Sequence, residues 1–264
     1  MFTNQNNYQK HIFFMKLALL QAKKVLGNTK LNPAVGCVIT RNNSLIGVGS
    51  TSLNGRPHAE DNAINFSKVD LNNSNLYVTL EPCSHLGKTP PCVKMIIKNK
   101  IKKVFFSVKD PDLRSFNKSS KILNKEKISV NIGISSNEIK DFYRSYFRYK
   151  KKKLPFVTCK LAISKDFFTI NRKNKWITNL YSRSRVHLMR SNHDCVMTSS
   201  ETVINDNPLL TCRINGLEKR SPSRIILDRK LRIPINSKII KKDGIYSTII
   251  FHNKVNKRGV SAKA

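Results

Sequence analysis

His58-Ala59-Glu60, followed by Glu81-Pro82-Cys83 and then by Pro91-Cys92, is the stretch that decides the fold and the chemistry of this chain. One histidine and two cysteines supply three zinc ligands and leave the fourth position of a tetrahedral site open for water, an arrangement typical of catalytic zinc. Glu60 follows His58 by two residues and is placed to pass protons to and from that water. The spacing predicts zinc ligands at His58, Cys83 and Cys92, with Glu60 as the catalytic acid and base.

The alternative is that His58 caps a helix and that Cys83 and Cys92 are ordinary buried thiols. A lone histidine among scattered cysteines would favour this alternative, but a His-x-Glu at a helix start with two Pro-Cys pairs downstream favours the metal site. We expect His58 and Cys92 at the starts of two helices, where the helix dipole favours thiolate over thiol and so favours metal binding.

The pattern resembles that of the zinc base deaminases, H-x-E followed by P-C-x-x-C, with residues 84–91 in place of the two-residue spacer. Segments 32–39, 57–60 and 77–92 closely resemble the bifunctional deaminase–reductase family of riboflavin biosynthesis, and a weaker resemblance runs from about Met15 to about Pro234. The resemblance implies an α/β fold for residues 1–149, a three-layer α/β/α cytidine-deaminase-like domain.

The resembled family removes the amine of a pyrimidine that carries a ribosylamino 5-phosphate, so a small phosphorylated pyrimidine is the expected partner. The family places substrate contacts at positions matching Asn32, His85 and Lys88. An asparagine offers a donor and an acceptor to a base edge, and a lysine offers charge to a phosphate. The alternatives are a turn asparagine before Pro33 and a solvated loop lysine. The loop from Asp110 resembles the family's Asp-Pro-Asn-Pro, with Asp112 replacing asparagine.

Residues 150–264 resemble the family's second domain, which is similar to dihydrofolate reductase and uses NADPH. The resemblance implies NADPH contacts at Trp176, Thr202 and Asp206, and substrate contacts at Arg190, Leu210 and Arg213. Phe167 replaces a glycine, residues 172–175 replace a Ser-Gly-x-Ser, and the family continues for roughly a hundred further residues on the domain-size scale. We therefore expect a truncated, partial dihydrofolate-reductase-like α/β domain that has lost reductase activity or is completed by a separate reductase chain. The alternative is a bifunctional enzyme.

The chain has 264 residues and a net charge of +33. Such a charge is typical of nucleic-acid binders, and a nucleic-acid deaminase is a third hypothesis. The lysines are spread along the chain, which favours compositional drift, and Lys150 to Lys153 is interpreted as a solvated linker between domains. A structural zinc protein is a fourth hypothesis, disfavoured by the three-ligand count.

No apolar run approaches the ~20 residues of a membrane span. The apolar run from Ile12 to Leu20 contains Lys16 and lacks a small-residue cleavage site, so we do not expect it to be a signal peptide. The four cysteines outside the motif are expected to be small buried residues in a reducing cytosol. We therefore predict a cytoplasmic protein, and the resemblance implies a homo-oligomer.

Hydrophobic periodicity predicts the secondary structure. Asn137 is expected to cap a long helix, and residues 156–163 have the pattern of a buried strand. The expected helices are 15–25, 58–68, 92–98, 118–124, 137–149 and 182–190, and the expected strands are 35–40, 44–49, 76–80, 103–108, 128–132, 156–163, 194–199, 224–228 and 247–252.

Overall fold

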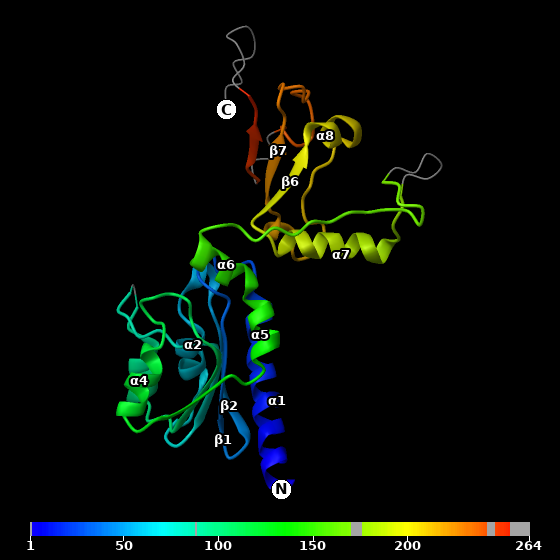
Figure 1. The fold of residues 1–264 in the computed structure, drawn as a ribbon. Helices are drawn as coiled ribbons and strands as arrows, with labels where there is room; N and C mark the ends of the chain where they lie inside the picture. Colours follow the sequence, from blue (N-terminus) through cyan, green and yellow to red (C-terminus); the bar gives the residue numbers. More distant parts are fainter. Residues whose placement is uncertain (1, 88, 170–175, 242–245, 254–264) are drawn as a thin grey trace. The chain divides into compact units, whose positions relative to one another are not determined.

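The computed structural model describes residues 2–87, 89–169, 176–241 and 246–253, and it divides into two compact units, Met1–Cys159 and Lys160–Ala264. Figure 1 shows the elements of each unit. The elements of the first unit are α1 (Phe2–Val25), β1 (Gly36–Arg41), β2 (Ser44–Ser50), a 3₁₀ turn (Leu53–Gly55), α2 (Ala59–Phe66), β3 (Asn75–Leu80), α3 (Cys92–Lys98), β4 (Lys103–Val108), α4 (Lys118–Lys125), β5 (Ser129–Ile132), α5 (Ser136–Phe142) and α6 (Arg144–Lys152).

The first unit is built on a five-stranded mixed sheet in the order β2-β1-β3-β4-β5. β1 is antiparallel to both β2 and β3, whereas β3, β4 and β5 are parallel. Helix α1 packs on β1 and β3 and α5 packs on β4, while α2 covers β1 and β2 and contacts α3 on the other face. The predicted three-layer α/β/α architecture is confirmed.

Burial on both faces explains the composition of the central strands. β3 and β4 are buried along almost their whole length, and such strands are nearly continuously apolar because helices cover both faces. The core of this unit includes Met15, Leu19, Ile39, Leu76 and Phe106. The parallel strands place the loops that follow their carboxyl ends at one edge of the sheet, and Cys83 and Asp110 lie in these loops.

Two helix predictions for the first unit were wrong. α1 begins at Phe2 rather than Met15, and within this added length His11 stacks on Phe105 with a centroid separation of 4.4 Å. The long helix predicted from Asn137 is two helices, separated at Tyr143, and Ser135 rather than Asn137 occupies the cap position. The Tyr143 side chain is buried at this break, and its hydroxyl donates to Ala34 O at 3.0 Å.

The second unit contains a parallel sheet in the order β6-β7-β8. Its elements are α7 (Leu180–Ser191), β6 (Cys195–Ser199), α8 (Ser200–Asp206), a 3₁₀ turn (Glu218–Arg220), β7 (Ser223–Leu227) and β8 (Thr248–Phe251). α8 was missed by the sequence analysis. The strand predicted over 156–163 is wrong, because this segment pairs with no strand among the described residues and most of it is exposed.

The four cysteines outside the zinc motif were predicted to be small buried residues. This prediction is confirmed for Cys37 and Cys212 and is wrong for Cys159 and Cys195, which are exposed. All six cysteines are free thiols. Within the described part of the chain, no helix combines the length and the hydropathy needed to span a membrane.

Candidate zinc-dependent active site

Three side chains from separate elements converge as candidate metal ligands. His58 is the cap residue of α2, Cys83 lies in the loop after β3, and Cys92 is the first residue of α3. Their ligand atoms all lie within 4.8 Å of one another. His58 Nδ1 is 3.3 Å from Cys92 Sγ and 3.5 Å from Cys83 Sγ. Ligands at zinc–nitrogen and zinc–sulfur distances of about 2.1 and 2.3 Å would stand about 3.6 Å apart in a tetrahedron, so the set fits zinc.

Glu60 is the second residue of α2 and is 4% exposed. Its helix approaches the sheet closely at Gly49, where a Cβ atom would stand 2.2 Å from Ala59 O. The glycine therefore lets the start of α2 sit directly on β2. This contact fixes the start of α2, from which His58 and Glu60 line the cleft.

Burial raises the pKa of Glu60 to about 7 in the metal-free site. A carboxyl group with a pKa near neutrality both accepts and releases protons readily, as an acid–base catalyst must. A hydrogen bond with Cys92 lowers the pKa of Cys83 to about 4, which favours the thiolate needed for metal binding. The hydrogen bond with Cys83 raises the pKa of His58.

One cleft brings the predicted substrate contacts Asn32 and His85 together with His58, Glu60 and Cys83. His85 Nδ1 is 2.9 Å from Ser115 Oγ, in the loop after β4, and this contact fixes the ring. Lys88, the third predicted contact, lies outside the described residues.

Asn32 is held by Thr29 and by Gly55, which lies in the loop before His58. Its backbone oxygen accepts a hydrogen bond from Thr29 Oγ1 at 2.7 Å. Gly55 has a φ of +92° and packs against the Asn32 side chain so closely that a Cβ atom there would stand 2.1 Å from Asn32 Nδ2. Both the conformation and the space at this position require glycine.

The same cleft is lined by three cations that the sequence analysis did not assign to the site, namely Arg56, Arg114 and Lys150. Lys150 Nζ pairs with Asp112 Oδ2 at 3.0 Å, and Arg114 Nη2 pairs with the same oxygen at 2.7 Å. The interpretation of Lys150 as part of a solvated linker is therefore wrong, because α6 continues through it and turns it toward the cleft. Lys150 follows Phe147 by three residues and Tyr146 by four. This spacing puts Lys150 on the helix face that packs inward, so the sequence did carry a signal for its position.

Glu81 ties the zinc loop to the loop after β4. Its carboxylate is 3% exposed and accepts hydrogen bonds from Ser119 Oγ at 2.7 Å and from the backbone nitrogens of Asp110 and Asn117 at 3.3 Å. Cys83 follows Glu81 by two residues. These hydrogen bonds therefore fix the loop that carries the metal ligand Cys83 against the loop that contains Asp112.

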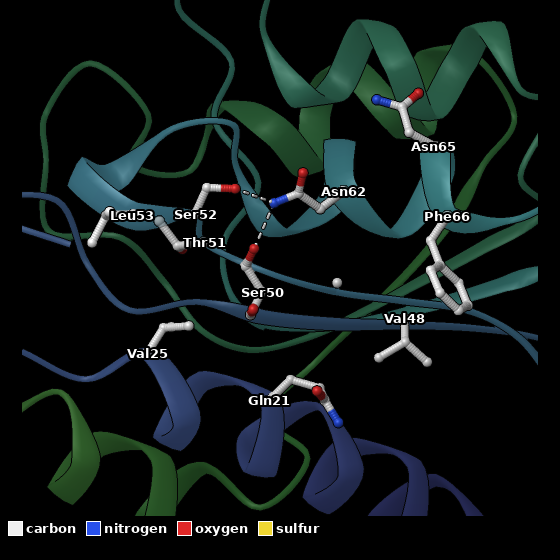
Figure 2. A pocket seen from close by; sticks show the side chains of 11 residues that line it. Gln21, Val25, Val48, Ser50, Thr51, Ser52, Leu53, Asn62, Asn65 and Phe66 are labelled. Carbon is white, nitrogen blue, oxygen red and sulfur yellow. Dashed lines mark hydrogen bonds between the residues drawn. The ribbon is translucent and has the colours of Figure 1, made fainter. Parts of the chain in front are cut away.

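A second hollow, of about 530 Å³, lies between α1, β2 and α2 (Figure 2). Asn62 Nδ2 donates across its wall to Ser50 O at 2.7 Å and to Ser52 Oγ at 2.8 Å. No ionisable side chain lines it, so it lacks the groups needed for acid–base chemistry. The smaller cleft at His58 is the site of interest.

In the second unit, the structure brings Arg190 to the loop that contains Leu210 and Arg213. Arg190 Nη1 donates to Thr211 O at 3.1 Å, and the backbone nitrogen of Arg213 donates to His187 Nδ1 at 3.2 Å. Leu210 is 9% exposed and packs in the core of this unit. Trp176 lies under the Arg183 guanidinium at 4.6 Å, and Thr202 and Asp206 lie on α8, so the predicted NADPH contacts come from separate segments. Residues 172–175 lie outside the described part.

Two family models match the chain: the cytidine and deoxycytidylate deaminase zinc-binding region over residues 8–108, and the RibD C-terminal domain over residues 155–262. The riboflavin biosynthesis protein RibD of Aquifex aeolicus is 36% identical over 95% of this chain and 70% of its own length. RibD of Buchnera aphidicola subsp. Baizongia pistaciae is 38% identical over 94% of this chain and 70% of its own length. RibD of Bacillus amyloliquefaciens is 36% identical, and this chain spans 64% of it.

Solved structures give the same result. The Thermotoga maritima diaminohydroxyphosphoribosylaminopyrimidine deaminase/5-amino-6-(5-phosphoribosylamino)uracil reductase is 36% identical, with a TM-score of 0.87 over 93% of this chain and 70% of that one. RibD of Acinetobacter baumannii is 32% identical, with a TM-score of 0.83 over 94% of this chain and 71% of that one.

Proposed function

Since the chain belongs to the RibD family of riboflavin-biosynthesis proteins, we propose that it catalyses the hydrolytic deamination of 2,5-diamino-6-(5-phosphoribosylamino)pyrimidin-4(3H)-one. The observation that carries the proposal is the convergence of His58, Cys83 and Cys92 within 4.8 Å, in a cleft where Glu60 is buried beside them. We assign the deaminase to residues 1–149 together with Lys150, which lines its cleft from the continuing helix α6, and the reductase-like domain to the residues that follow.

The three ligands would hold zinc, which supplies a water of lowered pKa when it is bound. Glu60 accepts a proton from the attacking water. It gives this proton to the ring nitrogen next to the carbon under attack, then takes up the proton of the new hydroxyl group and passes it to the leaving amine, so that ammonia and a carbonyl are formed. Burial raises the pKa of Glu60 above its usual range, which favours the uptake of a proton that an ordinary carboxylate would resist.

The remaining groups of the cleft would orient the pyrimidine. Asn32, fixed by Thr29 and Gly55, presents a side-chain amide to a base edge, and His85, fixed by Ser115, faces the same cleft. The Lys88 side chain is proposed as a phosphate contact because it belongs to the same loop as His85. Burial and the neighbouring Arg114 lower the pKa of His85, which favours the neutral ring.

The test is mass spectrometry of products formed from this substrate by the zinc-loaded protein. Wild type should convert the amine to a carbonyl. Glu60→Gln should keep its zinc and lose on the order of 100- to 10,000-fold in kcat, because the proton shuttle is gone. Asp61→Asn is the matched control, since Asp61 is the next residue of α2 and its carboxylate accepts from Asn65 Nδ2 at 2.9 Å.

An unchanged substrate with zinc confirmed in wild type would contradict the proposed function. Equal activity of Glu60→Gln and Asp61→Asn would contradict the role of Glu60.

The match of residues 155–262 to the RibD C-terminal domain favours reduction of the ribosyl group with NADPH as a second activity. Trp176, Thr202 and Asp206 would contact NADPH, and Arg190, Leu210 and Arg213 the substrate. Arginine suits the phosphate of such a substrate because its guanidinium donates two parallel hydrogen bonds. Oxidation of NADPH that depends on the deaminated product would support this activity. Absence of NADPH binding in titrations of the zinc-loaded protein would contradict it.

We also propose that the protein works in the cytoplasm as a homo-oligomer, as the family resemblance implies, and that a separate reductase chain is a candidate partner. Light scattering of the purified protein, alone and with such a chain, tests the two assemblies. A monomeric mass at working concentration would contradict self-association.

A further inference from the structure

The short segment of residues 33–36 joins Asn32, which lines the zinc-site cleft, to strand β1. Residues 34 and 35 are buried and belong to no helix or strand, so side chains must satisfy their backbone polar groups. Thr51 supplies part of what is needed, because its Oγ1 accepts from Val35 N at 2.9 Å and donates to Pro33 O at 3.1 Å.

Two buried hydroxyl groups supply the rest. The Tyr143 hydroxyl lies 2.6 Å from Thr79 Oγ1 and 3.0 Å from Ala34 O. Thr79 Oγ1 also accepts from Gly36 N at 3.1 Å. Since Ala34 O can only accept, the single proton of the Tyr143 hydroxyl points to it. The Thr79 hydroxyl must then donate to the Tyr143 oxygen, so the three hydrogen bonds run in one direction.

This chain of hydrogen bonds begins and ends on the same segment, at Gly36 and at Ala34. Its two hydroxyl groups come from β3 and from the break between α5 and α6. Tyr143 is 2% exposed, and burial raises the pKa of its hydroxyl, which therefore remains a neutral donor. Hydrogen bonds linked in this way in a buried environment polarise and strengthen one another.

The segment has little freedom to move by other means. A Cβ atom on Gly36 would stand 1.9 Å from Ala18 O, so the start of β1 already touches the backbone of α1. On the other side of the segment, the ring of Pro33 fixes its own φ and restricts the backbone of Asn32 before it. A displacement of Ala34 is therefore passed on to Asn32.

From these contacts we infer that Tyr143 is a positioning residue of the deaminase. With Thr79 it fixes the segment that presents the Asn32 amide to the pyrimidine. Tyr143 itself does not line the cleft, so it acts on the reaction only through this segment. The inference rests on the proposed function for the role of Asn32.

Deamination kinetics of the zinc-loaded full chain test the inference. Tyr143→Phe should keep its zinc and lose roughly tenfold in kcat/KM, because a misplaced contact orients the substrate less well. Thr79→Val should have the same effect, whereas Thr79→Ser keeps the hydroxyl and should keep the activity. Tyr149→Phe is the matched control, since it removes the hydroxyl of a tyrosine on α6 that is 38% exposed.

A double-mutant cycle with Asn32→Ala separates positioning from a general loss of stability. A residue that acts through Asn32 has nothing to position once the amide is removed, so Tyr143→Phe should then change kcat/KM by less than about twofold. The same tenfold loss in both backgrounds would overturn the inference. Wild-type kcat/KM in both Tyr143→Phe and Thr79→Val would overturn it as well.

Hydrogen exchange of the Gly36 amide, measured by NMR, gives a readout that does not depend on activity. Tyr143→Phe should speed this exchange roughly tenfold and Tyr149→Phe should leave it unchanged, because only the first variant breaks the chain that holds the segment. Unchanged exchange in Tyr143→Phe would overturn the inference. If wild type leaves the pyrimidine unchanged, exchange that depends on Tyr143 would uphold the anchoring of the segment and contradict only the proposed function.

Discussion

At the scale of single residues, the site depends on a few positions where only one side chain fits. Gly55 is the clearest case, because it combines a φ of +92° with contact against the Asn32 amide. The zinc ligands and Glu60 could be predicted from the sequence because their spacing is itself the chemical signature. The partners of Arg56 and Lys150 could not be predicted, since Thr89 and Asp112 are more than thirty residues away, and only the helix spacing of Lys150 indicated that it faces inward.

Gly55→Ala should therefore damage both folding and activity. The added methyl group would displace Asn32, and an alanine at positive φ is strained, so we expect a loss of about 1 kcal/mol or more in unfolding free energy and a clear fall in kcat/KM. Gly133→Ala is the matched control, since Gly133 has a φ of +102° with nothing within 4 Å of the added Cβ atom.

Urea unfolding and deamination kinetics on both variants give the answer. Gly133→Ala should lose stability alone and keep its kcat/KM. If Gly55→Ala keeps the kcat/KM of wild type, the placement of Asn32 by Gly55 is wrong.

At the scale of elements, periodicity predicted the strands and helices around the zinc site because each has a clear buried face. It failed where tertiary context overrides the local pattern. The helix predicted from Asn137 is interrupted at Tyr143, whose buried hydroxyl donates to Ala34 O. Residues 156–163 have a strand-like pattern, but a strand needs a neighbour for its backbone hydrogen bonds, and none of the described strands pairs with it.

The part of α1 before Met15, which was not predicted, contains His11. This residue makes the stability of the first unit sensitive to acid. His11 Nδ1 is 2.8 Å from the Tyr77 hydroxyl and its ring stacks on Phe105. Burial, with Lys10 and Lys103 nearby, lowers the pKa of His11 below 6.5. Below pH 6.5, the unfolded chain therefore binds a proton at His11 more readily than the folded chain does. The free energy of unfolding keeps this contribution above pH 6.5 and loses it as the pH drops through 6.5 toward the lowered pKa of the folded state.

His11→Phe should keep the stacking and flatten this part of the pH dependence. Urea midpoints of the zinc-loaded protein at pH 7.5 and 5.5 measure the effect, with His252→Gln as the control because His252 is exposed. Equal losses between the two pH values in wild type and His11→Phe would contradict the assignment to His11.

At the scale of the whole molecule, the charge of +33 coexists with a site for a small anionic substrate. A positive field raises the rate at which anions reach a cleft, and salt screens it, with a Debye length of about 10 Å at 0.1 M and about 3 Å at 1 M. We therefore expect the charge to raise the rate at which the anionic substrate reaches the cleft.

Steering of this kind predicts that kcat/KM for the phosphorylated substrate falls with added NaCl, on the order of tenfold between low and high salt. The dephosphorylated analogue carries no phosphate charge and should show little change. Parallel salt series on the two substrates measure the difference. The same slope for both would mean that the field does not steer the substrate.

Hydrolysis at the zinc site formed by His58, Cys83 and Cys92, with Glu60 beside it, is tested by running the zinc-loaded reaction in ¹⁸O-labelled water. Mass spectrometry should show that ammonia is released and that the new carbonyl of the pyrimidine carries one labelled oxygen. Chelation of the metal should stop both. A pyrimidine that keeps its amine, or one that loses it without taking up the label, would contradict hydrolysis at this site.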